Sequence, residues 1–203
     1  MVPELFKKNV PGSYEILQNA TVGIAGCGGI GSNAAVALVR AGIGALILVD
    51  FDLVEESNLN RQYYFQTDIG SKKVEALARH LLAINPAIRL TLIDRKITRA
   101  DVPEIFTCAC LLLEAFDSAD AKQWLLESWC KAYPEKPVVC ANGLSGIGKT
   151  EAITVRRAGM IHVAGDGESD MGMGLCSARV AIVANMQANI AIEILMNGSS
   201  IRS

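Results

Sequence analysis

Short apolar runs alternate with helical patterns over the first 141 residues of the chain. The runs typical of strands lie at residues 21–25, 45–49, 88–93, 108–116 and 138–141. Segments with apolar side chains at helical spacing lie between them, at 29–41, 71–84, 98–106 and 119–132, and Ser71 is expected to cap the second. Most of the runs are apolar throughout, which is typical of strands buried on both faces. The pattern predicts an α/β, Rossmann-like fold, with a mostly parallel sheet and helices on both faces.

The periodicity changes after residue 141. Residues 151–164 alternate around the turn Arg156-Arg157-Ala158-Gly159, which predicts a β-hairpin. A loop rich in Gly and Asp, at 165–174, then leads into a C-terminal helix at 175–197. Polar side chains interrupt the apolar stretch of this helix, which favours a buried helix over a membrane span. We therefore expect a single domain over residues 1–203, with an N-terminal arm at 1–20.

Composition narrows the possible chemistry. The chain has 203 residues, of which 51% are hydrophobic and 20% charged, enough for a buried core. A net charge of −2 and a pI of about 5.7 argue against a nucleic-acid or anionic-membrane surface. The six cysteines form no C-x-x-C pair, which predicts reduced thiols in a cytoplasmic protein. Only two histidines are present, so little room is left for a histidine base.

A first glycine motif follows the first predicted strand and opens the next helix. Its glycines, Gly26, Gly28, Gly29 and Gly31, match G-x-G-x-x-G and allow a tight turn with free amides facing a phosphate. Asp50 ends the second strand, where a carboxylate can bind ribose hydroxyls. The combination predicts a nucleotide site and suits NAD, S-adenosylmethionine or ATP equally.

A second glycine motif, at residues 143–150, matches the P-loop pattern G-x-x-x-x-G-K-T. A P-loop needs a helix to begin at Lys149-Thr150, so that helix amides face the phosphates. The segment that follows has a β-pattern ending in a turn. We therefore interpret this motif as a flexible connection before the hairpin.

Further polar motifs follow in order: Asp50-Phe51-Asp52, Ser57 to Gln62, Gly70 to Lys73, and Ala115 to Ser118. Together with the first glycine motif they resemble the ThiF/MoeB family, the adenylyltransferases that activate ubiquitin-like sulfur carriers. The resemblance extends from about residue 22 to residue 142. The chain looks most like the short, single-domain type of this family.

The resemblance implies a role for each matching position. It implies that ATP is bound by the glycine loop and by the following residues: Asp50, Asp52, Asn58, Arg61, Gln62 and Lys73. It implies that Asp117 binds Mg²⁺, and that Arg61, Lys73 and Asp117 are the catalytic residues. The implied cofactors are ATP and Mg²⁺.

The chemistry of adenylation is consistent with a chain poor in histidine. A carboxylate that attacks the α-phosphate of ATP is already an anion at neutral pH, so the reaction needs no histidine base. The site must supply positive charge on the phosphates and hold the reactants in line. Arg61, Lys73 and a Mg²⁺ on Asp117 are suited to that task.

Each of these residues also has a purely structural interpretation. Lys72 and Lys73 could be solvated lysines, although a cation in the first turn of a helix costs about 0.3–1 kcal/mol that a bound anion would remove. Asp117 could be only an N-cap, and Arg61 could be paired with Asp52 or Glu56. We favour phosphate binding by Lys73 and metal binding by Asp117.

A few residues fit no motif. Glu114 is unusual inside an apolar strand and is expected to support the site indirectly. Cys27 in the glycine loop is expected to be a small filler.

The sequence departs from the family in three respects. Relatives that bind a structural zinc use two C-x-x-C pairs, which are absent here, so we predict no zinc site. Relatives lend an N-terminal arginine to the partner subunit, but this chain has none before Arg40, so Lys7 or Lys8 would have to replace it. Beyond residue 130 the only cysteines are Cys140 and Cys176, which leaves a covalent sulfur-transfer step open.

The resulting hypothesis is adenylation of the C-terminal glycine of a sulfur carrier ending in Gly-Gly, of the thiamine-pathway type, by a homodimer. Alternatives within the family are a molybdopterin-type carrier, a peptide or a tRNA nucleoside as the activated carboxylate. An NAD(P)-dependent oxidoreductase would leave Asn58, Arg61 and Lys73 without a role. A non-catalytic carrier-binding module would not need Asp50, Arg61, Lys73 and Asp117.

Overall fold

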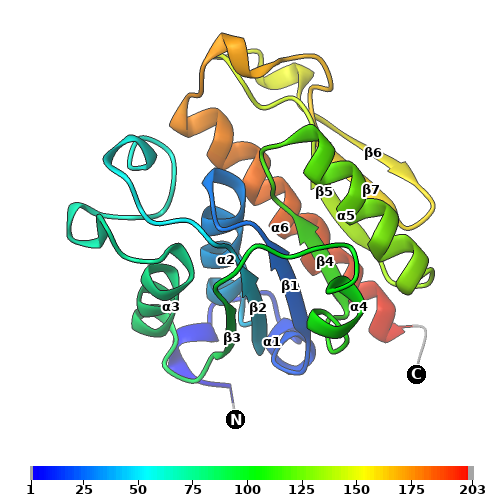
Figure 1. Cartoon of the computed structure of the whole chain (residues 1–203). Helices are drawn as coiled ribbons and strands as arrows, with labels where there is room; N and C mark the ends of the chain where they lie inside the picture. The colour runs from blue at the N-terminus through cyan, green and yellow to red at the C-terminus, as the bar shows by residue number, and fades with distance from the viewer. Residues whose placement is uncertain (1, 201–203) are drawn as a thin grey trace.

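The computed structural model of the chain describes residues 2–200, apart from the side chains of residues 171, 199 and 200. Its centre is one seven-stranded sheet in the order β3-β2-β1-β4-β5-β7-β6 (Figure 1). The strands are β1 (Thr21–Ala25), β2 (Ala45–Val49), β3 (Arg89–Ile93), β4 (Leu111–Glu114), β5 (Val138–Ala141), β6 (Thr154–Ala158) and β7 (Ile161–Gly165). Neighbouring strands are parallel except for the antiparallel β6–β7 pair.

Helices cover both faces of the sheet, as predicted. Buried side chains of α2 (Gly29–Ala41), α3 (Lys73–Ile84) and α6 (Ser177–Ser200) form one core layer, joined by α1 (Ser13–Leu17). On the other face, α4 (Val102–Ile105) and α5 (Ala119–Ala132) pack around Phe106 and Trp129. The predicted Rossmann-like α/β fold is confirmed.

The burial of each strand follows its place in the sheet. The central strands β4 and β5 are buried at every position, whereas the edge strand β6 is exposed at every position. The apolar runs therefore mark the strands that have helices on both faces. The hairpin turns at Gly159 and Met160, and Gly159 has φ +58. The turn predicted at Arg156-Arg157-Ala158-Gly159 is therefore placed too early, because the first three of these residues pair with β7 as part of β6.

Several predicted strands and helices begin or end at other residues in the structure. The strand expected at 108–116 is shorter in the structure, where β4 covers Leu111–Glu114. The helix expected at 98–106 is likewise shorter, because α4 covers Val102–Ile105. The final helix begins at Ser177 instead of residue 175. Ser71 does not cap α3, because its carbonyl accepts the amide of Val54 and the chain stays extended through Lys72. The apolar sequence continues past the end of each element, but backbone hydrogen bonds determine where the strand or helix ends.

The segment after the second glycine motif matches the β-pattern of the sequence. Lys149 is followed by a 3-10 helix of three residues, Thr150–Ala152, and then by β6. Within the described residues, the motif does not open a helix of the kind that a P-loop requires.

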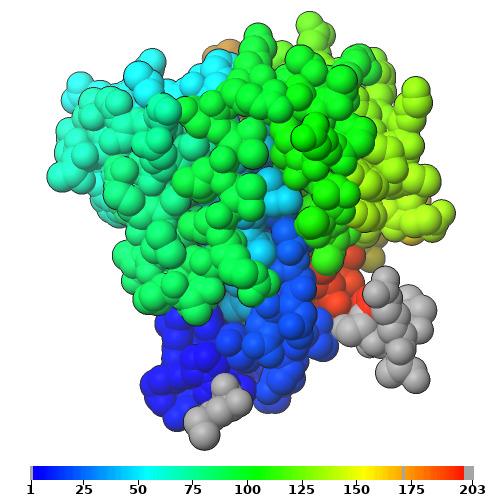
Figure 2. All heavy atoms as spheres, turned by 60° about the horizontal axis from the view of Figure 1, so that its bottom comes forward, coloured from blue at the N-terminus to red at the C-terminus, as the bar shows by residue number. Residues whose placement is uncertain are grey.

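The N-terminal arm lies at the end of the molecule remote from the first glycine motif. Phe6 stacks on Tyr14 with ring centroids 4.8 Å apart, and Nδ2 of Asn9 donates to the carbonyls of Arg40 and Ala41 at the end of α2. The arm is the blue segment at the lower edge of Figures 1 and 2. Residues 1 and 201–203 of the predicted domain lie outside the described residues.

One helix among the described residues, α6, is long and apolar enough to cross a membrane. Its window at 177–198 has a mean hydropathy of 1.3, and 39% of that window is buried in the protein. Core helices of globular proteins meet the same criterion. Val183, Ala184 and Ala191 of α6 are fully buried in the core layer shared with α2.

Candidate active site

The first glycine motif forms a tight turn between β1 and α2. Gly26 has φ +98, and a Cβ there would lie 2.6 Å from the carbonyl oxygen of Ala115. A Cβ on Gly31 would lie 1.8 Å from the carbonyl oxygen of Gly26. Both positions exclude any larger residue, so the first and last glycines of G-x-G-x-x-G are required by the close backbone contacts of this turn.

Asp50 connects the end of β2 to this turn. Its Oδ2 accepts the amide of Cys27 at 2.6 Å, and its Oδ1 accepts the amide of Asp52 at 2.9 Å. Burial raises the pKa of the Asp50 carboxyl above its ordinary value, although the two amides oppose that shift. The side chain lies at the edge of a cavity, where its remaining lone pairs can accept hydroxyl groups.

The cavity has a volume of about 300 Å³ and lies beyond the carboxyl ends of β2, β3 and β4. Its walls are aromatic on two sides: Phe51, and the pair Phe116 and Trp124, whose ring centroids are 5.9 Å apart. The remaining lining residues are Val49, Asp50, Arg95, Lys96, Ile97, Asp117, Ser118, Asp120 and Ala121. An apolar slot with polar groups at its mouth is typical of a site for a planar organic ligand.

Neither the aromatic walls nor the basic pair Arg95-Lys96 was predicted from the sequence. A usable signal existed for the basic pair, because it follows β3 at the same sheet edge as Asp50. The aromatic walls come from three separate segments, so no local pattern marks them.

Arg61 and Gln62 lie directly beside the glycine loop. A Cβ on Gly29 would be 3.6 Å from Cγ of Arg61, and one on Gly28 would be 3.8 Å from Nε2 of Gln62. Oε1 of Gln62 is buried without a hydrogen-bond partner. Such an unpaired buried acceptor is costly, and a donor from a ligand would satisfy it.

The structure does not pair Arg61 with Asp52 or Glu56, so that structural alternative is wrong. Its guanidinium donates to the carbonyl of Ser57 at 3.1 Å and to Oδ1 of Asn60 at 2.7 Å. Both bonds are exposed, which leaves the guanidinium accessible to an anion beside the glycine loop.

Asn58 supports the turn that presents Arg61 and Gln62. Its Oδ1 accepts the amide of Glu55 at 3.0 Å, and its carbonyl accepts the amide of Gln62 at 2.9 Å. The side chain is 8% exposed. These bonds make Asn58 a scaffold for the turn that carries Arg61 and Gln62.

Lys73 begins α3 with its side chain buried. Its Nζ donates to Oδ2 of Asp52 at 2.7 Å, and its amide donates to the carbonyl of Asp52 at 2.9 Å. Tyr64 joins this segment to the glycine loop, because its hydroxyl donates to the carbonyls of Cys27 and Lys73. Lys72 is instead paired at the surface with Asp94. Of the two lysines, Lys73 is thus the one directed toward the site.

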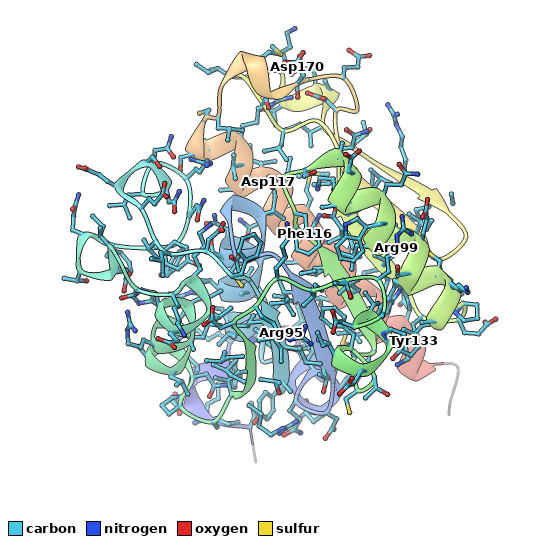
Figure 3. The ribbon with its side chains drawn as sticks, viewed as in Figure 1. Arg95, Arg99, Phe116, Asp117, Tyr133 and Asp170 are labelled. Atoms are coloured by element: carbon cyan, nitrogen blue, oxygen red, sulfur yellow. The ribbon has the colours of Figure 1, made fainter. Side chains whose placement is uncertain are left out.

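Asp117 follows β4 and faces the cavity (Figure 3). It is not the N-cap of α5, because Ser118 has that position and its hydroxyl accepts the amide of Ala121. The capping alternative for Asp117 is therefore wrong. Its carboxylate is exposed at the mouth of the cavity, close to the turn that contacts Gly26.

Comparison with known proteins gives the family of the chain. Residues 4–202 match the model of the ThiF family. The chain belongs to the ThiF family. A stretch of 97 residues is 44% identical to ubiquitin-like modifier-activating enzyme 5 of Drosophila pseudoobscura pseudoobscura, covering 48% of this chain and 24% of that protein. The enzyme of the same name from Caenorhabditis elegans is 39% identical over 97 residues. These matches span about a quarter of the length of the curated relatives.

Solved structures show the same fold. E. coli tRNA N6-threonylcarbamoyladenosine dehydratase, TcdA, in complex with ATP superimposes with a TM-score of 0.87 at 23% identity, covering 98% of this chain and 95% of that chain. E. coli MccB with ATP gives a TM-score of 0.72 at 24% identity, covering 90% of this chain and 58% of that chain. Members of the ThiF family are ATP-dependent adenylyltransferases.

The donor set of this ThiF-family chain fits Mg²⁺ at Asp117. The described residues contain no group of three or more His, Cys, Asp or Glu side chains that could hold a metal ion by themselves. Mg²⁺ at nucleotide sites is held by one or two carboxylates together with phosphate oxygens and water. An exposed carboxylate between the glycine turn and the cavity meets that requirement, and Asp120 lines the same cavity.

In this ThiF-family chain the candidate phosphate-binding groups lie beside the glycine loop, which Asp50 joins to a cavity lined by no histidine. Arg61 and the amides at the start of α2 supply positive electrostatic potential beside Gly28 and Gly29. His80 is paired with Asp68, and His162 lies on β7, so neither lines the cavity. This arrangement is suited to stabilising charge on phosphates and offers no imidazole base.

Proposed function

We propose that this protein catalyses the ATP- and Mg²⁺-dependent adenylation of the C-terminal glycine carboxylate of a ubiquitin-like sulfur carrier, releasing pyrophosphate. The observation that carries the proposal is the placement of Arg61 beside Gly29, with Asp50 and Asp117 at the mouth of the cavity. The named activity of the curated relatives, activation of ubiquitin-like modifiers, supports a carrier protein as the substrate.

Each group has a defined task in this reaction. The aromatic walls formed by Phe51, Phe116 and Trp124 accept the adenine, and Asp50 accepts the ribose hydroxyls. The phosphates lie over the amides that begin α2, where Arg61 stabilises the charge that develops as the α-phosphate is attacked. Lys73, shielded by Asp52, adds a second positive charge at this end.

Mg²⁺, when bound, offsets the charge of the pyrophosphate leaving group, and Asp117 is the residue that would hold it. The attacking carboxylate arrives ionised, so the chain only has to bind and orient it. This is why the reaction suits a site without histidine. We propose further that the protein works in the cytoplasm as a homodimer and has neither a nucleic acid nor a membrane as a partner.

The test is ATP–pyrophosphate exchange, measured with and without a purified carrier that ends in Gly-Gly. The expected result is exchange that depends on the carrier and that Arg61→Ala and Asp117→Ala abolish. Lys149→Asn serves as the control, because Lys149 belongs to the second glycine motif and is exposed. Asn tolerates the φ of +51 at that position.

Other outcomes identify the alternatives. Exchange that depends on a peptide or on a modified tRNA nucleoside, and not on a carrier, would contradict the carrier as substrate. Tight NADH binding without any exchange would contradict adenylation itself. Loss of ATP binding in Lys149→Asn, with Asp50→Ala harmless, would move the nucleotide to the second glycine motif.

A further inference from the structure

Glu114 is a fully buried carboxylate at the end of β4, in a strand that is otherwise apolar. Its Oε1 accepts the amide of Phe116 at 2.7 Å, and its Oε2 accepts Nζ of Lys122 at 2.8 Å. Its carbonyl accepts Nε2 of Gln187, on α6, at 3.2 Å. One residue thus joins the strand, the following turn and two helices.

These bonds fix the turn from which Asp117 projects. Oε1 of Glu114 accepts the backbone amide of Phe116, two residues further along the chain, and so fixes the backbone directly before Asp117. The amide of Ala115 donates to the carbonyl of Ala25 at 2.8 Å, and the carbonyl of Ala115 packs against Gly26. The turn is therefore attached on one side to the glycine loop and on the other to the Glu114 carboxylate.

Lys122 holds the other end of the same turn. Its amide donates to the carbonyl of Ser118, which places it in the first turn of α5. A cation at this end of a helix is unfavourable by about 0.3–1 kcal/mol unless an anion offsets it. The ion pair with Glu114 offsets that cost and ties α5 to β4 on both sides of Asp117.

Stability alone does not explain an ion pair at this place whose carboxylate is fully buried while the Lys122 side chain is 25% exposed. Replacing a buried ion pair by apolar residues of similar volume is often neutral or stabilising, whereas a charged pair with fixed hydrogen bonds specifies geometry. Five residues that line the cavity lie between Glu114 and Lys122, and of the two carboxylates among them Asp117 is the one that directly follows the Phe116 amide bound by Glu114.

We propose that Glu114 and Lys122 are positioning residues that orient the Asp117 carboxylate toward the phosphates of the bound nucleotide and their Mg²⁺. This inference rests on the proposed function, because it takes Asp117 as the metal ligand. Partners that orient metal ligands from outside typically change metal affinity by 10–100-fold when they are removed.

The test separates metal binding from nucleotide binding, with Mn²⁺ as the probe. Mn²⁺ is titrated by electron paramagnetic resonance into protein saturated with a non-hydrolysable ATP analogue. Metal-free affinity for the analogue is measured in EDTA through the change in tryptophan fluorescence, to which Trp124 in the cavity wall contributes beside the core residue Trp129. For Lys122→Met we expect at least about a tenfold loss of Mn²⁺ affinity, with metal-free analogue affinity within about twofold of the wild type.

Three further variants complete the set. Lys122→Arg keeps the charge and should recover most of the Mn²⁺ affinity. Glu114→Gln keeps the acceptor for Phe116 but loses the ion pair, so it should weaken Mn²⁺ binding and remains informative if Lys122→Met does not fold. Arg99→Met is the control. It breaks a surface ion pair of 2.6 Å with Glu127, which lies on α5 as Lys122 does. Figure 3 shows Arg99 apart from Asp117.

Unchanged Mn²⁺ affinity in both Lys122→Met and Glu114→Gln would overturn the proposal. So would an equal loss of Mn²⁺ and metal-free analogue affinity accompanied by a lower Tm, which is the result of a purely structural role. A wild type that binds the analogue and Mn²⁺ but shows no pyrophosphate exchange would contradict the proposed reaction and leave the positioning result standing. A wild type without analogue-dependent Mn²⁺ binding would contradict both.

Discussion

The amide of Cys27 donates a hydrogen bond of 2.6 Å to Oδ2 of Asp50, so the carboxylate that faces the cavity also holds the glycine loop in place. The other oxygen of Asp50 accepts the amide of Asp52. Asp50 is thus a structural anchor before any ligand binds, and its two functions should be separable by measurement.

Asp50→Ala is expected to lower both stability and nucleotide affinity. The buried amide of Cys27 and the part-buried amide of Asp52 lose a charged acceptor, and hydrogen bonds to charged groups contribute about 1.5–3 kcal/mol. The free energy of unfolding from urea titration should fall by that amount. Nucleotide affinity, measured by equilibrium titration, should fall at least tenfold, about 1.4 kcal/mol.

Asp94→Ala is the matched control. Asp94 follows β3 as Asp50 follows β2, but its side chain is 29% exposed and pairs with Lys72 at the surface. Exposed pairs contribute about 0–1 kcal/mol, so this variant should lose little stability and no nucleotide affinity. Equal losses in the two variants would contradict the anchor role of Asp50.

Arg61 should be required for the rate of exchange and not for folding. Its bonds to Ser57 and Asn60 are exposed, so Arg61→Ala should change the free energy of unfolding by about 0.5 kcal/mol or less. Exchange should fall about 10²–10³-fold, the range for loss of one charge-stabilising group. Arg61→Lys should recover only part of that loss, because lysine keeps the positive charge but lacks the planar guanidinium that binds phosphate with two hydrogen bonds.

Steady-state exchange kinetics and urea titration of the same preparations check this prediction. Arg99→Ala is the control for the removal of an exposed arginine. Full exchange activity in Arg61→Ala would contradict a role of Arg61 in the reaction, although its side chain lies beside Gly29.

The sequence was sufficient to predict the elements that are local in origin. The boundaries of β1, β2, β5, α2 and α5 match the predicted ranges residue for residue, because an apolar run or a helical period carries its own information. Asp50 and Asp117 also stand in motifs that follow strands, and Arg61 stands in a motif of the loop after β2; their roles in the site stay predictions.

The rest depends on contacts between distant segments. The partner of Lys73 is Asp52, and that of Glu114 is Lys122, pairs that only the packing of α3 and α5 determines. The expected cap at Ser71 was wrong because a long-range bond to Val54 keeps the backbone extended there. Local propensity gives no information on such pairings.

The ion pair between Arg179 and Asp166 should be the most stability-sensitive charge pair near the second glycine motif. Both side chains are buried, at 4% and 9% exposed, and Arg179 also donates to the carbonyls of Gly148 and Lys149. Removing one partner of a buried pair costs about 3–5 kcal/mol. Asp166→Asn should lower the free energy of unfolding by about that amount at pH 7.

The pH dependence of this effect has a defined sign. Burial alone would raise the pKa of Asp166, but the amides of Ser169 and Glu168 and the guanidinium of Arg179 hold it below its ordinary value. A carboxyl with a lowered pKa in the folded state stabilises above the ordinary value of 3.8, and that stability is lost as the pH falls through the lowered pKa. The difference in the free energy of unfolding between wild type and Asp166→Asn should be constant from about pH 5 to 8. It should shrink below about pH 4, which is close to the ordinary pKa of an Asp carboxyl.

Glu193→Gln is the control for this pair. Glu193 is paired with Arg157 at 3.0 Å, and both side chains are about half exposed, so the loss should stay below about 1 kcal/mol. Equal destabilisation by Glu193→Gln and Asp166→Asn at pH 7 would contradict the special role of the buried pair.

The two cysteines left open for a covalent step should differ sharply in reactivity. Cys140 is buried in β5, its thiol donates to the carbonyl of His162, and burial raises its pKa to about 11. Cys176 is half-buried and lies directly before α6. At pH 8 a thiol with that pKa has about 10²-fold less thiolate than a free cysteine of pKa about 8.5. Cys140 should therefore react slowly, and only through local opening of the sheet.

Labelling with iodoacetamide at pH 8, followed residue by residue through mass spectrometry of tryptic peptides, tests this. The exposed Cys108 serves as the internal reference for a fast thiol. Cys140 should be protected about 10²-fold relative to Cys108, and its protection should disappear in urea. Cys140→Ala should retain carrier-dependent exchange, because a buried thiol with a raised pKa cannot act as a nucleophile at neutral pH. Rapid labelling of Cys140 in the folded protein would contradict this and would restore it as a candidate for the covalent step.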